Sequence, residues 1–189
     1  MKNIANPSPI FRYFPFDVAI LNKSKNNIIF VLDRLVFLIH HKNSHLDKNH
    51  NLHYFQTDKM PFLYESLAFE FGPLKLSSIV KYCEFLNGLL NDESLRGKTI
   101  IHKTLADREL CANAALLIGS ISVLHLDMLP NDVMKMLTYE RHYYYAEYKD
   151  SSSVNRARHM PLAECITAIH KAKLINIFDP NDFNIKEYD

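Results

Sequence analysis

The sequence is poor in cysteine and carries almost no net charge. Its 189 residues include only three cysteines, Cys83, Cys111 and Cys165. Three scattered thiols are too few for a disulfide framework and lack the paired spacing of a zinc site, which favours a reducing compartment. The formal net charge is +1 at pH 7, so no broad electrostatic field points to nucleic acid or an anionic membrane as the partner. We therefore expect a cytoplasmic protein that binds other proteins.

The sequence also has little that would serve as a leader, a membrane span or a linker. Its first nine residues contain no apolar core of the kind a secretory signal needs. The two most apolar stretches, 28–39 and 112–126, are interrupted by polar residues and are shorter than the roughly 20 residues of a spanning helix. With 48% hydrophobic and 23% charged residues, the chain is expected to fold as a single domain.

The N-terminal residues differ from the rest. Prolines and aromatics without a sustained period predict an extended arm over residues 1–27, followed by the folded domain over 28–189. The aromatic side chains of this arm are candidate anchors for a partner protein. They are Phe11, Tyr13, Phe14 and Phe16.

The first part of the folded domain reads as strands followed by a helix. Segments 34–39 and 52–56 are rich in branched or aromatic residues, which predicts a β-hairpin with a long polar connection. Beyond Gly72, apolar residues recur at three- and four-residue steps from Leu76 to Leu90, which predicts a helix with Pro73 in its first turn.

The second part of the domain also reads as a strand followed by helices. A strand over 98–102 runs into the segment 103–110, and a helix is expected from about Asp107 to Leu126. This helix is apolar nearly all round and contains small residues, so we expect it to be central and close to a sheet. Asn131 and Asp132 can cap a short helix, and Pro161 opens another. These elements predict an α/β domain with a small central sheet flanked by helices.

The strand, loop and helix around residues 98–126 form a potential anion site, because backbone N–H groups and the helix dipole both face the loop. Cysteine-dependent phosphatases place a His-Cys-x5-Arg segment here, in which a thiolate attacks phosphorus and the Arg holds the phosphoryl oxygens. In this chain Lys103 stands where the nucleophile would be, and Glu109 where the Arg would be. The Cys-x5-Arg pattern occurs nowhere in the sequence. The positions of the degenerate loop are His102, Lys103, Thr104, Asp107, Arg108 and Glu109.

A series of short motifs resembles one family over roughly residues 28–188. They are Asp33-Arg34-Leu35-Val36-Phe37, His53-Tyr54-Phe55-Gln56-Thr57-Asp58, Phe69-Glu70-Phe71-Gly72-Pro73-Leu74, Lys81-Tyr82-Cys83 with Leu86-Asn87, Ile101-His102-Lys103-Thr104, Ala112-Asn113-Ala114-Ala115-Leu116-Leu117-Ile118-Gly119, Tyr148-Lys149-Asp150-Ser151, and Phe178-Asp179 with Phe183 and Glu187-Tyr188. Together they resemble the N-terminal, non-catalytic domain of the cell-division-cycle-fourteen type dual-specificity phosphatases.

The resemblance implies a phosphatase-like α/β fold with a degenerate active-site loop, which packs in the family against a second, catalytic domain. It also implies an acidic groove that favours basic residues after a phosphorylated Ser-Pro. The candidate groove residues here are Asp179, Asp182, Glu187 and Asp189. Unlike the family, which keeps basic residues before the Ala-Asn-Ala, this chain has Glu109-Leu110-Cys111.

Three further features allow two interpretations each. The histidines between His40 and His53 could bind zinc through His41 and His45, or lie in a solvated loop. The tyrosines at 143–145 could stack on nucleic acid bases, or cover the edge of the core or a partner surface. Lys103 and Arg108 could hold a phosphoryl group, or pair with neighbouring carboxylates. We favour the second interpretation of each, and predict no metal and no cofactor.

The leading functional hypothesis is a catalytically inactive phosphatase-like domain that acts as an interaction or structural module, with a cytoskeletal or ciliary assembly as one possible setting. The alternative is the specificity half of a dual-specificity phosphatase whose catalytic domain is on another chain.

Overall fold

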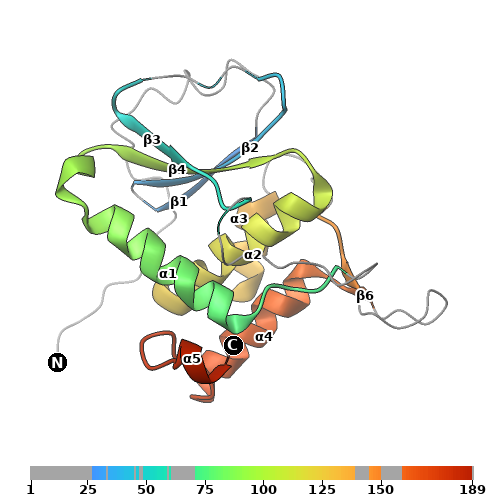
Figure 1. Ribbon diagram of the computed structural model, residues 1–189. Helices are drawn as coiled ribbons and strands as arrows, with labels where there is room; N and C mark the ends of the chain where they lie inside the picture. Colours follow the sequence, from blue (N-terminus) through green and yellow to red (C-terminus); the bar gives the residue numbers. More distant parts are fainter. Residues whose placement is uncertain are drawn as a thin grey trace.

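A computed structural model describes the sheet, the helices and most of the loops of the domain (Figure 1). The described residues are 27–32, 34–44, 46, 49–58, 60, 71–138, 145–149 and 159–188. The elements in chain order are β1 (Asn27–Leu32), β2 (Leu35–His40), β3 (Leu52–Phe55), α1 (Leu76–Asn91), the 3-10 helix η2 (Glu93–Leu95), β4 (Thr99–Leu105), α2 (Arg108–His125), α3 (Pro130–Thr138), β5 (Tyr148–Lys149), β6 (His159–Met160), α4 (Leu162–Leu174) and α5 (Ile185–Tyr188).

The main sheet is mixed, with the strand order β1-β2-β4-β3. β1 pairs antiparallel with β2, whereas β2 and β3 both run parallel to β4. The hairpin expected between 34–39 and 52–56 is therefore wrong, because β4 lies between the two strands. The apolar stretch 28–39 instead contains a strand pair of its own, β1 and β2. The expectation of an α/β domain with a small central sheet flanked by helices is confirmed.

Arg34 follows β1 and ties the start of β2 to three other segments. Its guanidinium donates hydrogen bonds to the carbonyl oxygens of Lys98 (3.1 Å), Leu90 (3.3 Å) and Leu95 (2.8 Å). One of these carbonyls belongs to the last turn of α1, where helix carbonyls lack intrahelical partners and a cation is favourable. Arg34 therefore fixes the end of α1 against the sheet.

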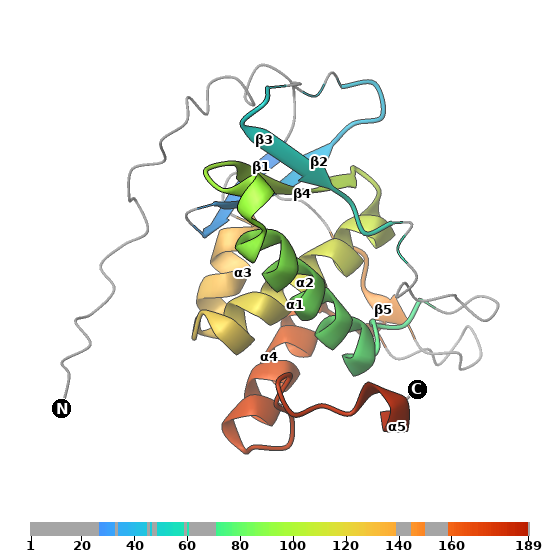
Figure 2. The ribbon, with the colours of Figure 1, turned by 60° about the vertical axis from the view of Figure 1, so that its left-hand side comes forward.

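The helices gather against one face of the sheet, with α2 at the centre (Figures 1 and 2). The main hydrophobic core lies on this side, and a smaller cluster around Val36, Leu38 and Ile101 lies on the other. As expected, α2 is buried along nearly its whole length. The small residue Gly119, however, faces a helix: a Cβ placed there would lie 2.6 Å from Ile166 Cδ1 on α4. Its lack of a side chain permits the close approach of α2 and α4.

The helix starts differ from the predictions in two places. Pro73 lies outside α1, which is preceded by Lys75 as its N-cap, so the expectation of Pro73 in the first turn is wrong. α3 begins at Pro130, one residue before the predicted Asn131 cap, which suits proline because the first helical N–H has no intrahelical partner. Pro161 is the N-cap of α4 as the sequence indicated.

The C-terminal segment packs back on the helices through aromatic rings. Phe178 is buried, its ring centroid lies 5.5 Å from that of Phe183, and Phe183 lies 4.9 Å from Tyr188. Helix α5 contacts α1. No helix in the described ranges is long and apolar enough to span a bilayer.

Candidate functional site: the junction of strand β4 and helix α2

The carboxyl ends of the parallel strands β2, β3 and β4 meet at one edge of the sheet, where α/β proteins commonly place their ligands. The sequence predicts a loop from Lys103 that leads into α2 at this edge. β4 instead continues to Leu105, and only Ala106 and Asp107 connect it to α2. His102 therefore lies in the strand as predicted, and Lys103 and Thr104, which were expected in the loop, belong to the strand as well. A two-residue connection is too short to wrap around a phosphoryl group.

Asp107 occupies the amino end of α2. Its carboxylate oxygen Oδ1 accepts hydrogen bonds from the backbone N–H groups of Glu109 and Leu110, both at 3.0 Å. Amides of this kind are the ones that bind an anion at a helix N-terminus. The chain's own carboxylate therefore takes the place that an external phosphate would need. Arg108 and Glu109 are both exposed on the first turn of α2.

His102 is fully buried beside this junction. Its Nε2 lies 3.1 Å from Thr57 Oγ1, and its Nδ1 lies 2.9 Å from the Tyr82 hydroxyl oxygen. The ring also stacks on Phe55 at a centroid distance of 4.8 Å. Both ring nitrogens thus have partners in the neutral imidazole, in which one nitrogen donates and the other accepts. Burial lowers the pKa of His102 to about 3, so the ring is neutral at physiological pH.

A second pair of polar side chains, Thr104 and Asp58, joins β4 to the segment after β3 at the same edge of the sheet. The Thr104 hydroxyl donates to Asp58 Oδ1 at 3.5 Å. Burial raises the pKa of Asp58, and the hydrogen bond from Thr104 opposes this shift. Residues 57 and 58 follow β3, whereas residues 102 and 104 lie on β4, so each pair joins the two neighbouring strands. In both pairs a side chain on β4 is therefore hydrogen-bonded to a side chain that follows β3.

The three thiols are unsuited to nucleophilic attack. All three cysteines are buried. Burial raises the pKa of Cys83 to about 12 and that of Cys165 to about 11. The Cys111 thiol donates to the carbonyl oxygen of Leu105 at 3.0 Å. Because the thiolate is the reactive form, a protonated and buried thiol is the wrong starting point for phosphoryl transfer.

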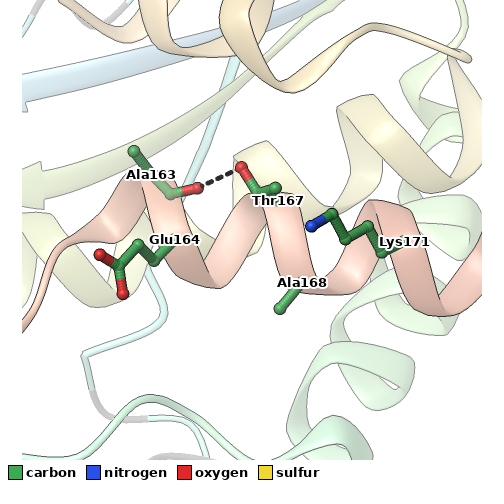
Figure 3. A pocket seen from close by; sticks show the side chains of 5 residues that line it. All are labelled: Ala163, Glu164, Thr167, Ala168 and Lys171. Atoms are coloured by element: carbon green, nitrogen blue, oxygen red, sulfur yellow. Dashed lines mark hydrogen bonds between the residues drawn. The ribbon is translucent and has the colours of Figure 1, made fainter.

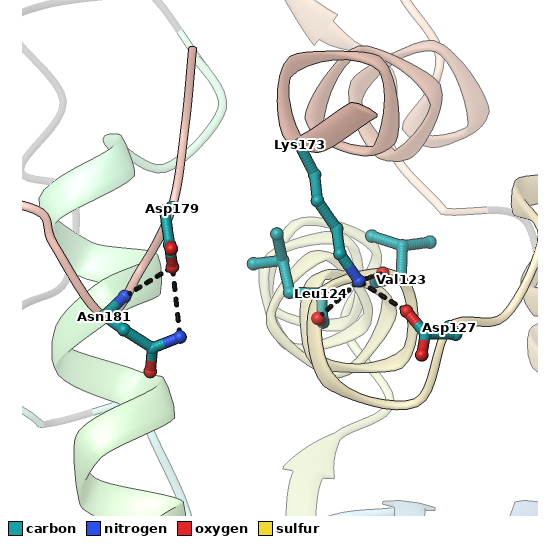
Figure 4. Close-up of polar contacts among 6 residues, drawn as sticks. All are labelled: Val123, Leu124, Asp127, Lys173, Asp179 and Asn181. Atoms are coloured by element: carbon teal, nitrogen blue, oxygen red, sulfur yellow. Dashed lines mark hydrogen bonds and ion pairs between the residues drawn. The ribbon is translucent and has the colours of Figure 1, made fainter. Parts of the chain in front are cut away.

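The candidate groove residues lie far from the junction in sequence, on the segment after α4. Asp179, Asp182 and Glu187 are exposed, and Asp189 lies outside the described residues. Asp179 accepts hydrogen bonds from the backbone N–H (2.9 Å) and the side chain (3.0 Å) of Asn181 (Figure 4). It thereby stabilises a turn, which holds the segment in a fixed conformation.

Lys173, drawn in the same figure, caps the carboxyl end of α2. Its ammonium group donates to the carbonyl oxygens of Val123 (3.1 Å) and Leu124 (2.7 Å) and to Asp127 Oδ1 (2.6 Å) (Figure 4). A cation at the carboxyl end of a helix satisfies carbonyls that lack intrahelical partners. Both ends of the central helix are therefore capped from within the chain.

The remaining sequence candidates fall largely outside the described ranges. The arm anchors Phe11, Tyr13, Phe14 and Phe16 lie there, as do Tyr143 and Tyr144. Tyr145 donates a hydrogen bond to the carbonyl oxygen of Leu137 at 2.9 Å and packs against the core. Among the residues that the structure describes, no group of three or more His, Cys, Asp or Glu side chains is placed to hold a metal ion.

Sequence reasoning missed the partners of His102. Thr57 and Tyr82 are 45 and 20 residues away from it, and no local spacing links them. Both belong to motifs that resemble the family, His53–Asp58 and Lys81–Cys83. Their place in these motifs was the one signal in the sequence that could have pointed to them, since a motif residue without a chemical role of its own often holds another side chain in position.

The fold and the junction together define a phosphatase-like α/β domain, and comparison with known proteins agrees. A family model described as the N-terminal half of dual specificity protein phosphatase matches residues 29–172. The chain is 33% identical over 160 residues to the dual specificity protein phosphatase CDC14AB of Danio rerio, covering 85% of this chain and 26% of that protein. It is 34% identical over 139 residues to CDC14A of Homo sapiens, covering 74% of this chain and 23% of that protein.

A more distant relative is the tyrosine-protein phosphatase CDC14 of Saccharomyces cerevisiae, which is 21% identical over 135 residues, or 71% of this chain and 24% of that protein. The chain spans about a quarter of the length of the relatives it matches. It belongs to the family of N-terminal halves of dual specificity protein phosphatases, and within that family to the CDC14 type. The resemblance drawn from the motifs is thereby confirmed.

Proposed function

We propose that this domain is a non-catalytic, protein-binding module of the CDC14 type. The observation that carries the proposal is the β4–α2 junction. There, Asp107 accepts the amide hydrogen bonds that a phosphoryl group would require, at 3.0 Å each. The connection from Leu105 to Arg108 contains only two residues. A site filled by its own side chains offers no cradle for phosphorus, so a role in binding through the surface is favoured.

The chemistry of the other groups supports the same proposal. Hydrolysis through a phosphoenzyme needs an exposed nucleophile of low pKa and a cation that holds the phosphoryl oxygens. The cysteines are buried, and Glu109 carries the charge opposite to the one required. His102, which resembles the histidine next to the nucleophile in active relatives, is fully buried.

A phosphatase assay tests this proposal directly. Purified full chain is incubated with an aryl phosphate, next to an active cysteine-dependent phosphatase as a positive control. We expect no turnover above the buffer blank, at any pH from 5 to 8. If the chain hydrolyses the substrate and Lys103→Ala abolishes that activity, the proposal is wrong. A contaminating phosphatase is recognised by activity that Lys103→Ala leaves unchanged.

The second candidate function is the specificity half of a phosphatase whose catalytic domain is on another chain. One observation favours it: the matched family is described as the N-terminal half of dual specificity protein phosphatase. The exposed carboxylates Asp179, Asp182 and Glu187 would then contribute to a groove for basic residues after a phosphorylated Ser-Pro.

This second function predicts conditional binding. A phosphorylated Ser-Pro peptide with downstream lysines should bind when a catalytic phosphatase domain is present and fail to bind to the chain alone. Affinity purification of the native protein should recover a phosphatase subunit, and purification without one contradicts the specificity role. The cytoskeletal or ciliary setting stays a prediction of the sequence, tested by whether removal of residues 1–16 weakens incorporation of the protein into such an assembly.

A further inference from the structure

We draw no further inference here: the strongest candidate, the shallow hollow of about 320 Å³ on the outer face of α4, which is lined by Ala163, Glu164, Thr167, Ala168 and Lys171 (Figure 3) and precedes the exposed Leu174 and Ile175, carries none because nothing in the structure shows what covers it.

Discussion

His102 and Asp107 at the β4–α2 junction are paired within the chain, whereas Glu164 and Lys171 on the outer face of α4 face solvent. A ligand at the junction would first have to displace the Thr57, Tyr82 and backbone hydrogen bonds that hold these groups. A partner on α4 would displace only water. The comparison shows where binding would cost less: the polar groups at the junction already have partners within the chain, whereas the outer face of α4 is exposed.

The largest expected effect comes from opening the junction. His102→Ala removes a fully buried ring and leaves the hydroxyl groups of Thr57 and Tyr82 without their partner. We expect a loss of about 4 kcal/mol in the free energy of unfolding, from the cavity and the unpaired hydroxyls together. Urea unfolding followed by circular dichroism measures it, since the chain has no tryptophan.

His41→Ala is the matched control for this variant, because the His41 side chain is exposed and its loss should change stability by less than about 0.5 kcal/mol. A similar effect of both variants would show that the junction is not a structural core. A smaller loss is expected for Thr57→Val and Tyr82→Phe, about 1 to 2 kcal/mol each, because each leaves a single ring nitrogen unpaired.

A change of pH probes the same site without a substitution. The pKa of His102 is about 3 in the folded chain and 6.5 for an ordinary histidine, so the unfolded state binds the extra proton first as the pH falls. The contribution of the neutral ring to stability is therefore complete above about pH 6.5 and declines below it. Between pH 7 and pH 5 this group should lower the free energy of unfolding by about 2 kcal/mol.

The decline is measured as the difference between wild type and His102→Gln, which cancels the contribution of the other titrating groups. The wild type should lose more stability than the variant over this interval. Parallel pH profiles for the two proteins would contradict the assignment of His102 as a buried neutral group.

The smallest expected effect is on phosphatase activity, when substitutions supply the missing His-Cys-x5-Arg segment. Lys103→Cys together with Glu109→Arg creates a His-Cys-x5-Arg segment, yet we expect hydrolysis of an aryl phosphate to stay at the blank. Position 103 lies within β4, and only Ala106 and Asp107 separate the strand from α2, so the segment cannot form a phosphate loop. Activity in this double variant would show that the junction can rearrange.

Several elements followed from the sequence alone because their causes are local. The apolar residues of α1 recur every three or four positions, and Asp107 and Pro161 both mark helix starts that the structure contains. Strand pairing could not be predicted from local patterns. β2 pairs with β4 across more than 60 residues of chain, and the apolar stretch 28–39, although interrupted by two charged residues, was not predicted to contain two strands.

The sequence by itself determined three features: the absence of Cys-x5-Arg, the motifs of the family and the apolar faces of the helices. Each depends only on residues within a few positions of one another. Only the tertiary structure decided that the polar groups at the β4–α2 junction find their hydrogen-bond partners within the chain. His102 meets Thr57 and Tyr82 because parallel strands and α1 bring distant segments together. The length of β4, and with it the short connection to α2, depends on pairing with β2 up to His40, a register that no local pattern encodes.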